Sequence, residues 1–116
     1  MAFTDRELSE HLDVLEKKFW SHRRPPVRLR GQVREGQRIL GHSIELFLVR
    51  PMYQQPGVFA EESIAKLTFV RTKKLWRLYW KRADGKWHGY IPRPEVKTLA
   101  EALRIVDEDQ LCCFLG

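Results

Sequence analysis

Residues 74–91 constrain the fold of this chain more than any other segment. Two runs in which apolar and polar side chains alternate flank the pair Asp84-Gly85, which is the strongest short-range sequence signal for a tight β-hairpin. A two-residue turn with Ala83 opposite Lys86 places polar and aromatic side chains on one face and bulky apolar side chains on the other. The predicted cross-strand pairs are Lys81 with His88, Tyr79 with Tyr90, and Trp80 with Gly89.

Three further segments have the patterning of β-strands. Apolar and polar side chains alternate in the first, and the second is more apolar, as expected of a central strand. We predict a turn at residues 35–37 and a tight turn at Lys73-Lys74, which places Thr72 opposite Leu75. With that register, both hairpins agree on which face of the sheet is apolar. The predicted strands are residues 27–34, 39–50 and 64–72, with a loop over 51–62.

Two capping boxes predict a helix on each side of the strands, one at Thr4 to Glu7 and one at Thr98 to Glu101. The first helix is expected to end near residue 22, and the second near residues 107–109. Each has one apolar stripe, so both helices can cover the apolar face of the sheet. The chain is therefore predicted to be a single α+β domain over residues 1–116, with a five-stranded antiparallel meander and both helices packed on one face.

The basic residues are concentrated in the middle of the chain, whose formal net charge is +6. Residues 23–94 hold sixteen Lys or Arg against five Asp or Glu, whereas both flanking segments are acidic. Such a basic block indicates affinity for a polyanion or for an acidic partner surface.

The predicted open face of the sheet combines these cations with aromatic rings. Single-stranded nucleic acid is bound by such a combination, because Lys and Arg neutralise phosphates and rings stack on bases. The alternative is that the face is polar because it is solvated, and that Tyr79 and Tyr90 only pack on one another. The candidate ligand-binding residues are Arg28, Arg30, Arg34, Lys66, Arg77, Tyr79, Lys81, His88 and Tyr90.

Signals for a cofactor, a metal or a catalytic site are weak in this sequence. The four histidines lack metal-ligand spacing, and Cys112 and Cys113 are adjacent, so they form neither a disulfide framework nor a metal motif. We therefore predict no cofactor and no metal, and an enzyme is disfavoured. If a catalytic acid–base pair exists, it is His88 with Tyr90 or Glu45.

The location and the assembly are also expectations. The adjacent cysteines fit a reducing cytoplasm, and the N-terminal residues lack the basic and apolar regions of a signal peptide, so no membrane association is expected.

The apolar segment 111–115 is expected to dock on the core or on a second copy. We favour a homodimer over a monomer. A protein-interaction module without nucleic-acid binding is the alternative function.

Several short motifs, distributed over nearly the whole chain, resemble a small bacterial family that is catalogued only as a domain of unknown function. The resemblance implies a single compact bacterial domain, and it brings no activity, cofactor or catalytic residue. The motifs are Arg23-Arg-Pro-Pro26, Val70-Arg-Thr-Lys-Lys-Leu-Trp76, Tyr79-Trp-x-Arg-Ala-Asp84, Lys86-Trp-His-x-Tyr90, Pro94-Glu-Val-Lys-Thr-Leu99, Val106-Asp-Glu-Asp109 and Cys113-Phe-x-Gly116.

Overall fold

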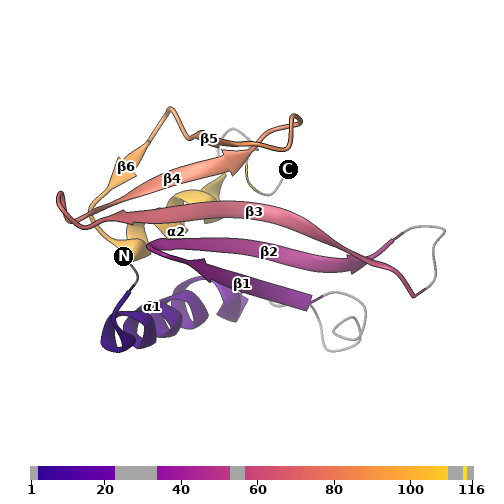
Figure 1. Ribbon diagram of the computed structural model, residues 1–116, viewed down its shortest axis with the longest axis horizontal. Helices are drawn as coiled ribbons and strands as arrows, with labels where there is room; N and C mark the ends of the chain where they lie inside the picture. The colour runs from indigo at the N-terminus through magenta and orange to yellow at the C-terminus, as the bar shows by residue number, and fades with distance from the viewer. Residues whose placement is uncertain (1–2, 23–33, 53–56, 110–113, 115–116) are drawn as a thin grey trace.

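The computed structural model shows an antiparallel sheet whose strands β1 to β5 follow one another in meander order, with a helix at each end of the chain (Figure 1). A short sixth strand, β6, pairs with β4. The elements are α1 (Asp5–Lys18), the 3-10 turn η1 (Trp20–His22), β1 (Arg34–Leu40), β2 (Ser43–Pro51), β3 (Phe59–Val70), β4 (Leu75–Lys81), β5 (Trp87–Gly89), β6 (Glu95–Val96) and α2 (Leu99–Glu108). The structure describes residues 3–22, 34–52, 57–109 and 114.

These elements confirm the predicted α+β class, the antiparallel meander and the two flanking helices. The predicted strand at residues 27–34 lies outside the described residues except for Arg34, which begins β1. The predicted loop over 51–62 is shorter, because β3 already begins at Phe59. None of the described helices is long and apolar enough to cross a membrane.

The helices begin where their capping residues predict. Thr4 Oγ1 accepts a hydrogen bond from the Glu7 amide at 3.2 Å, and Glu7 Oε1 accepts one from the Thr4 amide at 2.9 Å. Thr98 Oγ1 caps α2 by accepting a hydrogen bond from the Glu101 amide at 3.1 Å. These bonds satisfy amides that have no partner within the helix. α1 ends at Lys18, and η1 continues the chain to residue 22.

The core lies between the sheet and the two helices. Leu15 of α1, Phe19 at the C-cap of that helix, and Leu103 and Val106 of α2 are fully buried. They belong to one apolar cluster with the residues of β2, β3 and β4 whose side chains point to the same side of the sheet. Residues of both helices belong to this one cluster, and α2 lies behind the sheet in Figure 1. Both helices therefore pack on one face of the sheet, and the other face stays open. The sheet residues of this cluster include Ile44, Leu46, Leu67, Trp76 and Leu78.

The first hairpin differs from the predicted one. Residues 35–37, predicted as a turn, lie within β1, and the predicted strand 39–50 is interrupted by a tight turn at Gly41. Gly41 has φ 61°, a left-handed conformation that glycine adopts without steric cost. Gly36 lies opposite Phe47 instead, and a Cβ at this position would be 2.5 Å from Phe47 Cε2. This glycine makes room for an aromatic ring and does not form a turn.

The turn between β3 and β4 is longer than predicted. Val70, and not Thr72, lies opposite Leu75. The register therefore differs by two positions, and a shift of two leaves every side chain on its predicted face because strand side chains alternate with period two. Leu67 still faces the core, where it lies opposite Leu78.

The β4–β5 hairpin has a register one residue away from the prediction. Gly85 has φ 78°, and it is the only described residue of this turn with a positive φ, whereas the predicted two-residue turn needs two. The Arg82 amide donates to Lys86 O at 3.1 Å, and the Gly85 amide donates to Arg82 O at 2.9 Å, which closes a three-residue loop. A shift of one residue turns every side chain of β5 to the other face. The observed pairs are Tyr79 with Gly89, Trp80 with His88, and Lys81 with Trp87.

A polar and aromatic cluster joins α1 to the sheet. Glu7 accepts hydrogen bonds from both terminal nitrogens of Arg71, at 2.8 and 3.1 Å, and Arg71 contributes most to lowering the pKa of Glu7 to about 2. The ring of His11 packs edge-on against the rings of both Phe3 and Trp76, with centroid distances of 4.9 and 5.0 Å. Burial lowers the pKa of His11 below its usual value, because the charged imidazolium loses its hydration there.

We predict that acid destabilises the fold through His11. Its pKa is lower in the folded state than in the unfolded chain, so its stabilising contribution is complete above pH 6.5 and is lost as the pH falls below that value. Urea unfolding of the wild type and of His11→Phe between about pH 5 and 8 tests this. The difference in unfolding free energy between the two proteins is expected to move in favour of the variant as the pH falls. A difference that stays constant over this range contradicts the prediction.

Candidate functional site

The open face of β3, β4 and β5 carries the best candidate for a functional site. Alternation along β4 points Arg77, Tyr79 and Lys81 away from the helices, since Trp76 and Leu78 between them are buried in the core. Lys66 of β3 lies opposite Tyr79, and Trp87 of β5 lies opposite Lys81. Two cations and two rings therefore share this part of the sheet. We call Lys66, Tyr79, Lys81 and Trp87 the lysine–aromatic surface.

Each lysine of this surface lies beside one ring. Lys66 Nζ is 5.8 Å from the centroid of the Tyr79 ring, and Lys81 Nζ is 5.5 Å from the centroid of the Trp87 ring. These distances are typical of a cation–π contact. Among the residues that the structure describes, no carboxylate forms an ion pair with either lysine. Both ammonium groups are therefore available to an anionic ligand.

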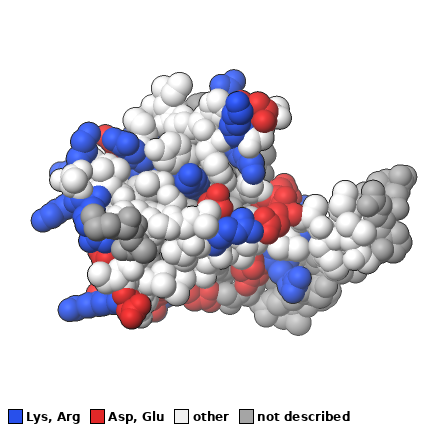
Figure 2. All heavy atoms as spheres, viewed as in Figure 1, with Lys and Arg blue, Asp and Glu red and all other residues white. Residues whose placement is uncertain are grey.

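The arginines of the open face are engaged by carboxylates. Arg38 contacts Glu61 at 2.6 Å and Glu45 at 3.3 Å, and Arg77 contacts Glu95 at 2.9 Å. These hydrogen bonds raise the pKa of both guanidinium groups above the usual value. Figure 2 shows acidic and basic side chains beside one another on this side of the molecule. The open face is thus less basic than the sequence suggests. Among the described residues of β3 and β4, its cations without an ion pair are Lys66 and Lys81.

A hollow of about 360 Å³ adjoins Tyr79. It lies where β5 and β6 pair with the same edge of β4. Tyr90 and Pro94 hydrogen-bond to Leu78 there, and residues 91–93 loop out between them. Nothing lies within 4 Å of the position that a Cβ of Gly89 would occupy, so the glycine opposite Tyr79 leaves space beside the ring. The hollow is lined by Arg77, Leu78, Tyr79, Gly89, Pro94 and Glu95.

The structure brings together only some of the residues predicted to bind a ligand. Lys66, Arg77, Tyr79 and Lys81 lie on the open face of β3 and β4. Arg34 lies on β1, at the other edge of the sheet, where its guanidinium is 6.0 Å from the centroid of the Phe59 ring. The remaining two basic candidates, Arg28 and Arg30, lie outside the described residues.

The placement of His88 and Tyr90 on the open face is wrong, because the register of β5 is shifted by one residue. Tyr90 is only 3% exposed, and its ring packs on Phe114 with a centroid distance of 4.7 Å. His88 lies opposite Trp80, on the helix side of the sheet, and its Nε2 is 2.9 Å from Asp84 Oδ2.

Trp87 is the residue that the sequence analysis missed. Trp87 lies opposite Lys81 on the open face, where the predicted two-residue turn would place His88. The signal that could have identified it is Ala83-Asp84-Gly85, since a three-residue loop ending in glycine is the next most common hairpin connection. Asp84 supports this loop, because its Oδ1 accepts the Lys86 amide at 2.9 Å.

The candidate acid–base residues are not brought together. Glu45 is bound by Arg38, Tyr90 packs in the core, and His88 is bound to Asp84. The Lys86 amide, followed by His88, lowers the pKa of Asp84 below its usual value. Within the described part of the chain, no group of three or more His, Cys, Asp or Glu side chains is arranged to hold a metal ion.

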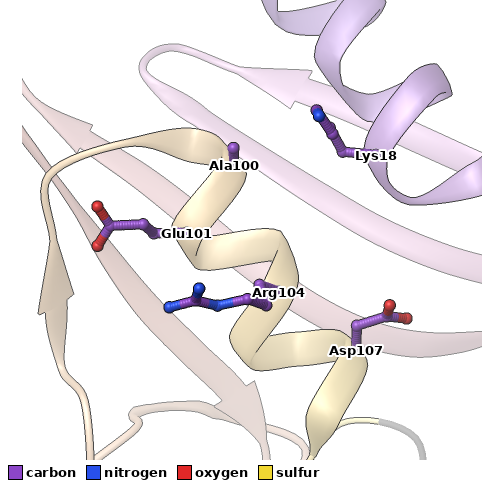
Figure 3. Close-up of a pocket in the computed structure, with 5 residues that line it drawn as sticks. All are labelled: Lys18, Ala100, Glu101, Arg104 and Asp107. Carbon is purple, nitrogen blue, oxygen red and sulfur yellow. The ribbon is translucent and has the colours of Figure 1, made fainter.

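A second hollow, of about 320 Å³, lies between the two helices (Figure 3). It combines Lys18 of α1 with Glu101, Arg104 and Asp107 of α2. Figure 3 shows Glu101 and Arg104 extending to one side of α2, while Lys18 lies across from that helix. Because the charges are of both signs and do not converge on one point, this hollow is a weaker candidate than the lysine–aromatic surface.

Comparison with known proteins identifies one family. Its sequence model matches residues 4–116 and is described as Domain of unknown function (DUF3024). Neither a curated protein nor a solved structure matches the chain. The resemblance to a family of unknown function that the motifs indicate is therefore confirmed, and no activity comes with it.

We predict that Trp87, in β5, and Tyr90, which directly follows β5, contribute differently to the stability of the fold. Tyr90→Ala removes a buried ring and is expected to lower the free energy of unfolding by about 3–5 kcal/mol. Trp87→Ala, on the open face, is expected to cost less than about 1 kcal/mol. Urea denaturation of both variants measures these values. The two-residue turn predicts the reverse order, so a larger loss for Trp87→Ala would contradict the observed register.

Proposed function

We propose that this protein, which belongs to the DUF3024 family of unknown function, is a binding module that takes single-stranded nucleic acid on its lysine–aromatic surface. The observation that carries the proposal is the pairing of Lys66 with Tyr79 and of Lys81 with Trp87 on one open face. The adjacent Cys112 and Cys113 suit a cytoplasmic location for this activity.

The chemistry of the four side chains fits the two parts of a nucleotide. An aromatic ring provides a stacking plane worth about 1–3 kcal/mol per base, and an ammonium group neutralises a phosphate. Tyr79 and Trp87 are diagonal neighbours on adjacent strands, a relation that separates their Cα atoms by about 7–8 Å. Two bases of one strand can therefore stack on the two rings, with the phosphates near the lysines. The hollow beside Tyr79 gives the first base room.

A single strand fits this surface better than a duplex. In a duplex the base faces are stacked on one another, and a protein reads only base edges and backbone through the grooves. The open face of a sheet offers rings to unstacked bases, whereas a helix or a two-stranded ribbon fills a major groove.

Fluorescence anisotropy with a labelled oligonucleotide of about 12 nucleotides tests the proposal. The wild type is expected to bind at low salt, with an affinity that falls steeply as salt is added. Replacing both Lys66 and Lys81 by Ala should weaken binding and reduce the slope of log K against log salt by about 1.4, since each phosphate contact in a single strand contributes about 0.7. Tyr79→Ala should weaken binding by about tenfold and leave the slope unchanged.

The matched control replaces Lys17 and Lys18 of α1 by Ala, which removes the same charge from the helix side of the molecule. This control is expected to bind as the wild type does. Equal loss in the control and in the Lys66 and Lys81 variant would mean that only net charge matters. That result, or the absence of any binding at low salt, would refute the proposed site.

Self-association is a second candidate function, because part of β3 has a free edge. Within the described residues, β3 pairs with β4 only from Lys66 onward, so the backbone of residues 59–65 has no neighbour on that side. Phe59 at its start is 48% exposed. An unpaired strand edge with an exposed ring favours pairing with another chain. Phe114, by contrast, packs on Tyr90 of its own chain.

Light scattering over a range of concentrations tests this second candidate. We expect a homodimer whose mass depends little on salt, because apolar and backbone contacts hold it together. Phe59→Lys should shift the protein to a monomer, while Ile91→Lys, which changes an 87% exposed residue elsewhere, should not. A wild type that is monomeric at all concentrations would refute a stable dimer and would leave the nucleic-acid proposal standing.

A further inference from the structure

A further hollow of about 420 Å³ lies beside the β4–β5 hairpin. This volume lies within the range of small-molecule sites. Trp80 and His88, which are cross-strand neighbours, form one wall, and Ile91 and Pro94 form another. Because Trp80 and Tyr79 are consecutive residues of β4, this hollow uses side chains that point away from the lysine–aromatic surface.

One end of this hollow is positively charged. The guanidinium of Arg82 lies 5.5 Å from the centroid of the Trp80 ring, which holds it at the hollow. Within the described residues, Arg82 has no carboxylate in an ion pair, and Asp84 in the same turn is already bound to the Lys86 amide and to His88. The fork of Arg82 therefore remains available to a planar anion, and a carboxylate matches its geometry in a bidentate manner.

The other end is apolar. Ile91 is 87% exposed, the largest exposure among the described large apolar side chains, and it lines the hollow together with the Pro94 ring. A hydrocarbon group placed here would cover Ile91 and part of Trp80 and remove their apolar surface from water.

We infer that this hollow is a binding site for an apolar monocarboxylate, with the carboxylate on Arg82 and the hydrocarbon body on Trp80, Ile91 and Pro94. His88 closes the site beside Trp80, and its bond to Asp84 fixes the orientation of its ring. The same chemistry occurs in a free aliphatic acid and in the C-terminal residue of a peptide, and the two sources are separated by experiment. This inference does not depend on nucleic-acid binding at the lysine–aromatic surface.

The probes are hexanoate and its neutral counterpart hexanamide, followed in two-dimensional NMR spectra by the indole signal of Trp80. Hexanoate is expected to shift this signal in a saturable way, and hexanamide is expected to leave it almost unchanged. A short peptide ending in leucine, with a free or an amidated C-terminus, forms the second arm. Competition by the free-acid peptide identifies a peptide terminus as a ligand, and binding of hexanoate alone identifies a small acid.

Arg82→Gln should weaken hexanoate binding by at least about tenfold, because it removes a hydrogen bond to a charged group. Ile91→Ser should weaken binding without unfolding the protein, since the side chain is exposed. Arg104→Gln, an exposed arginine of α2 outside this hollow, is the matched control and should bind as the wild type does. Tyr79→Ala should also retain hexanoate binding. The inference is overturned if hexanoate gives no saturable shift, if hexanamide binds equally, or if Arg82→Gln binds as the wild type does.

Discussion

The turn at Gly85 determines which side chains this protein presents to its surroundings. Its backbone hydrogen bonds close a three-residue loop, and that loop sets the register of β4 against β5. Side chains alternate along a strand, so this one choice places Trp87 on the open face and Tyr90 in the core. The buried ring then packs on the ring of Phe114. A local turn therefore decides both a core contact and the composition of the exposed face.

The packing of both helices on one side of the sheet has a second consequence for function. All the apolar side chains that α1 and α2 bury lie on one face, which leaves the opposite face to water. An open antiparallel face is polar for that reason alone, and its carboxylates engage Arg38 and Arg77. What distinguishes the lysine–aromatic surface is that Lys66 and Lys81 contact rings and, among the described residues, form no ion pair with a carboxylate. This arrangement, and not the net charge of the chain, supports a binding function.

The sequence predicts the parts of the fold that depend on patterns longer than a turn. Both helices follow from their capping residues and apolar stripes, and the meander follows from consecutive strand patterns. The errors lie at the turns, where the prediction depends on which glycine forms the turn. Gly36 looks like a turn residue but accommodates the Phe47 ring, whereas Gly41 forms the turn. The faces on which the candidate residues lie were predicted correctly for β3 and β4, because a two-residue shift preserves faces, and wrongly for β5, because a one-residue shift does not.

Strand β4 is common to both of the proposed sites. Tyr79 and Lys81 point to the open face, while Trp80 and Arg82 point to the other side, so each side of the strand combines one ring with one cation. On each side a hollow adjoins the ring, and Gly89 and Pro94 line both hollows. Both hollows lie where β5 gives way to β6 along one edge of β4, with Tyr90 and Pro94 hydrogen-bonded to Leu78 and residues 91–93 looping out. One strand can therefore offer two separate surfaces because its side chains alternate, and the three-residue loop decides which residues of β5 complete each of them.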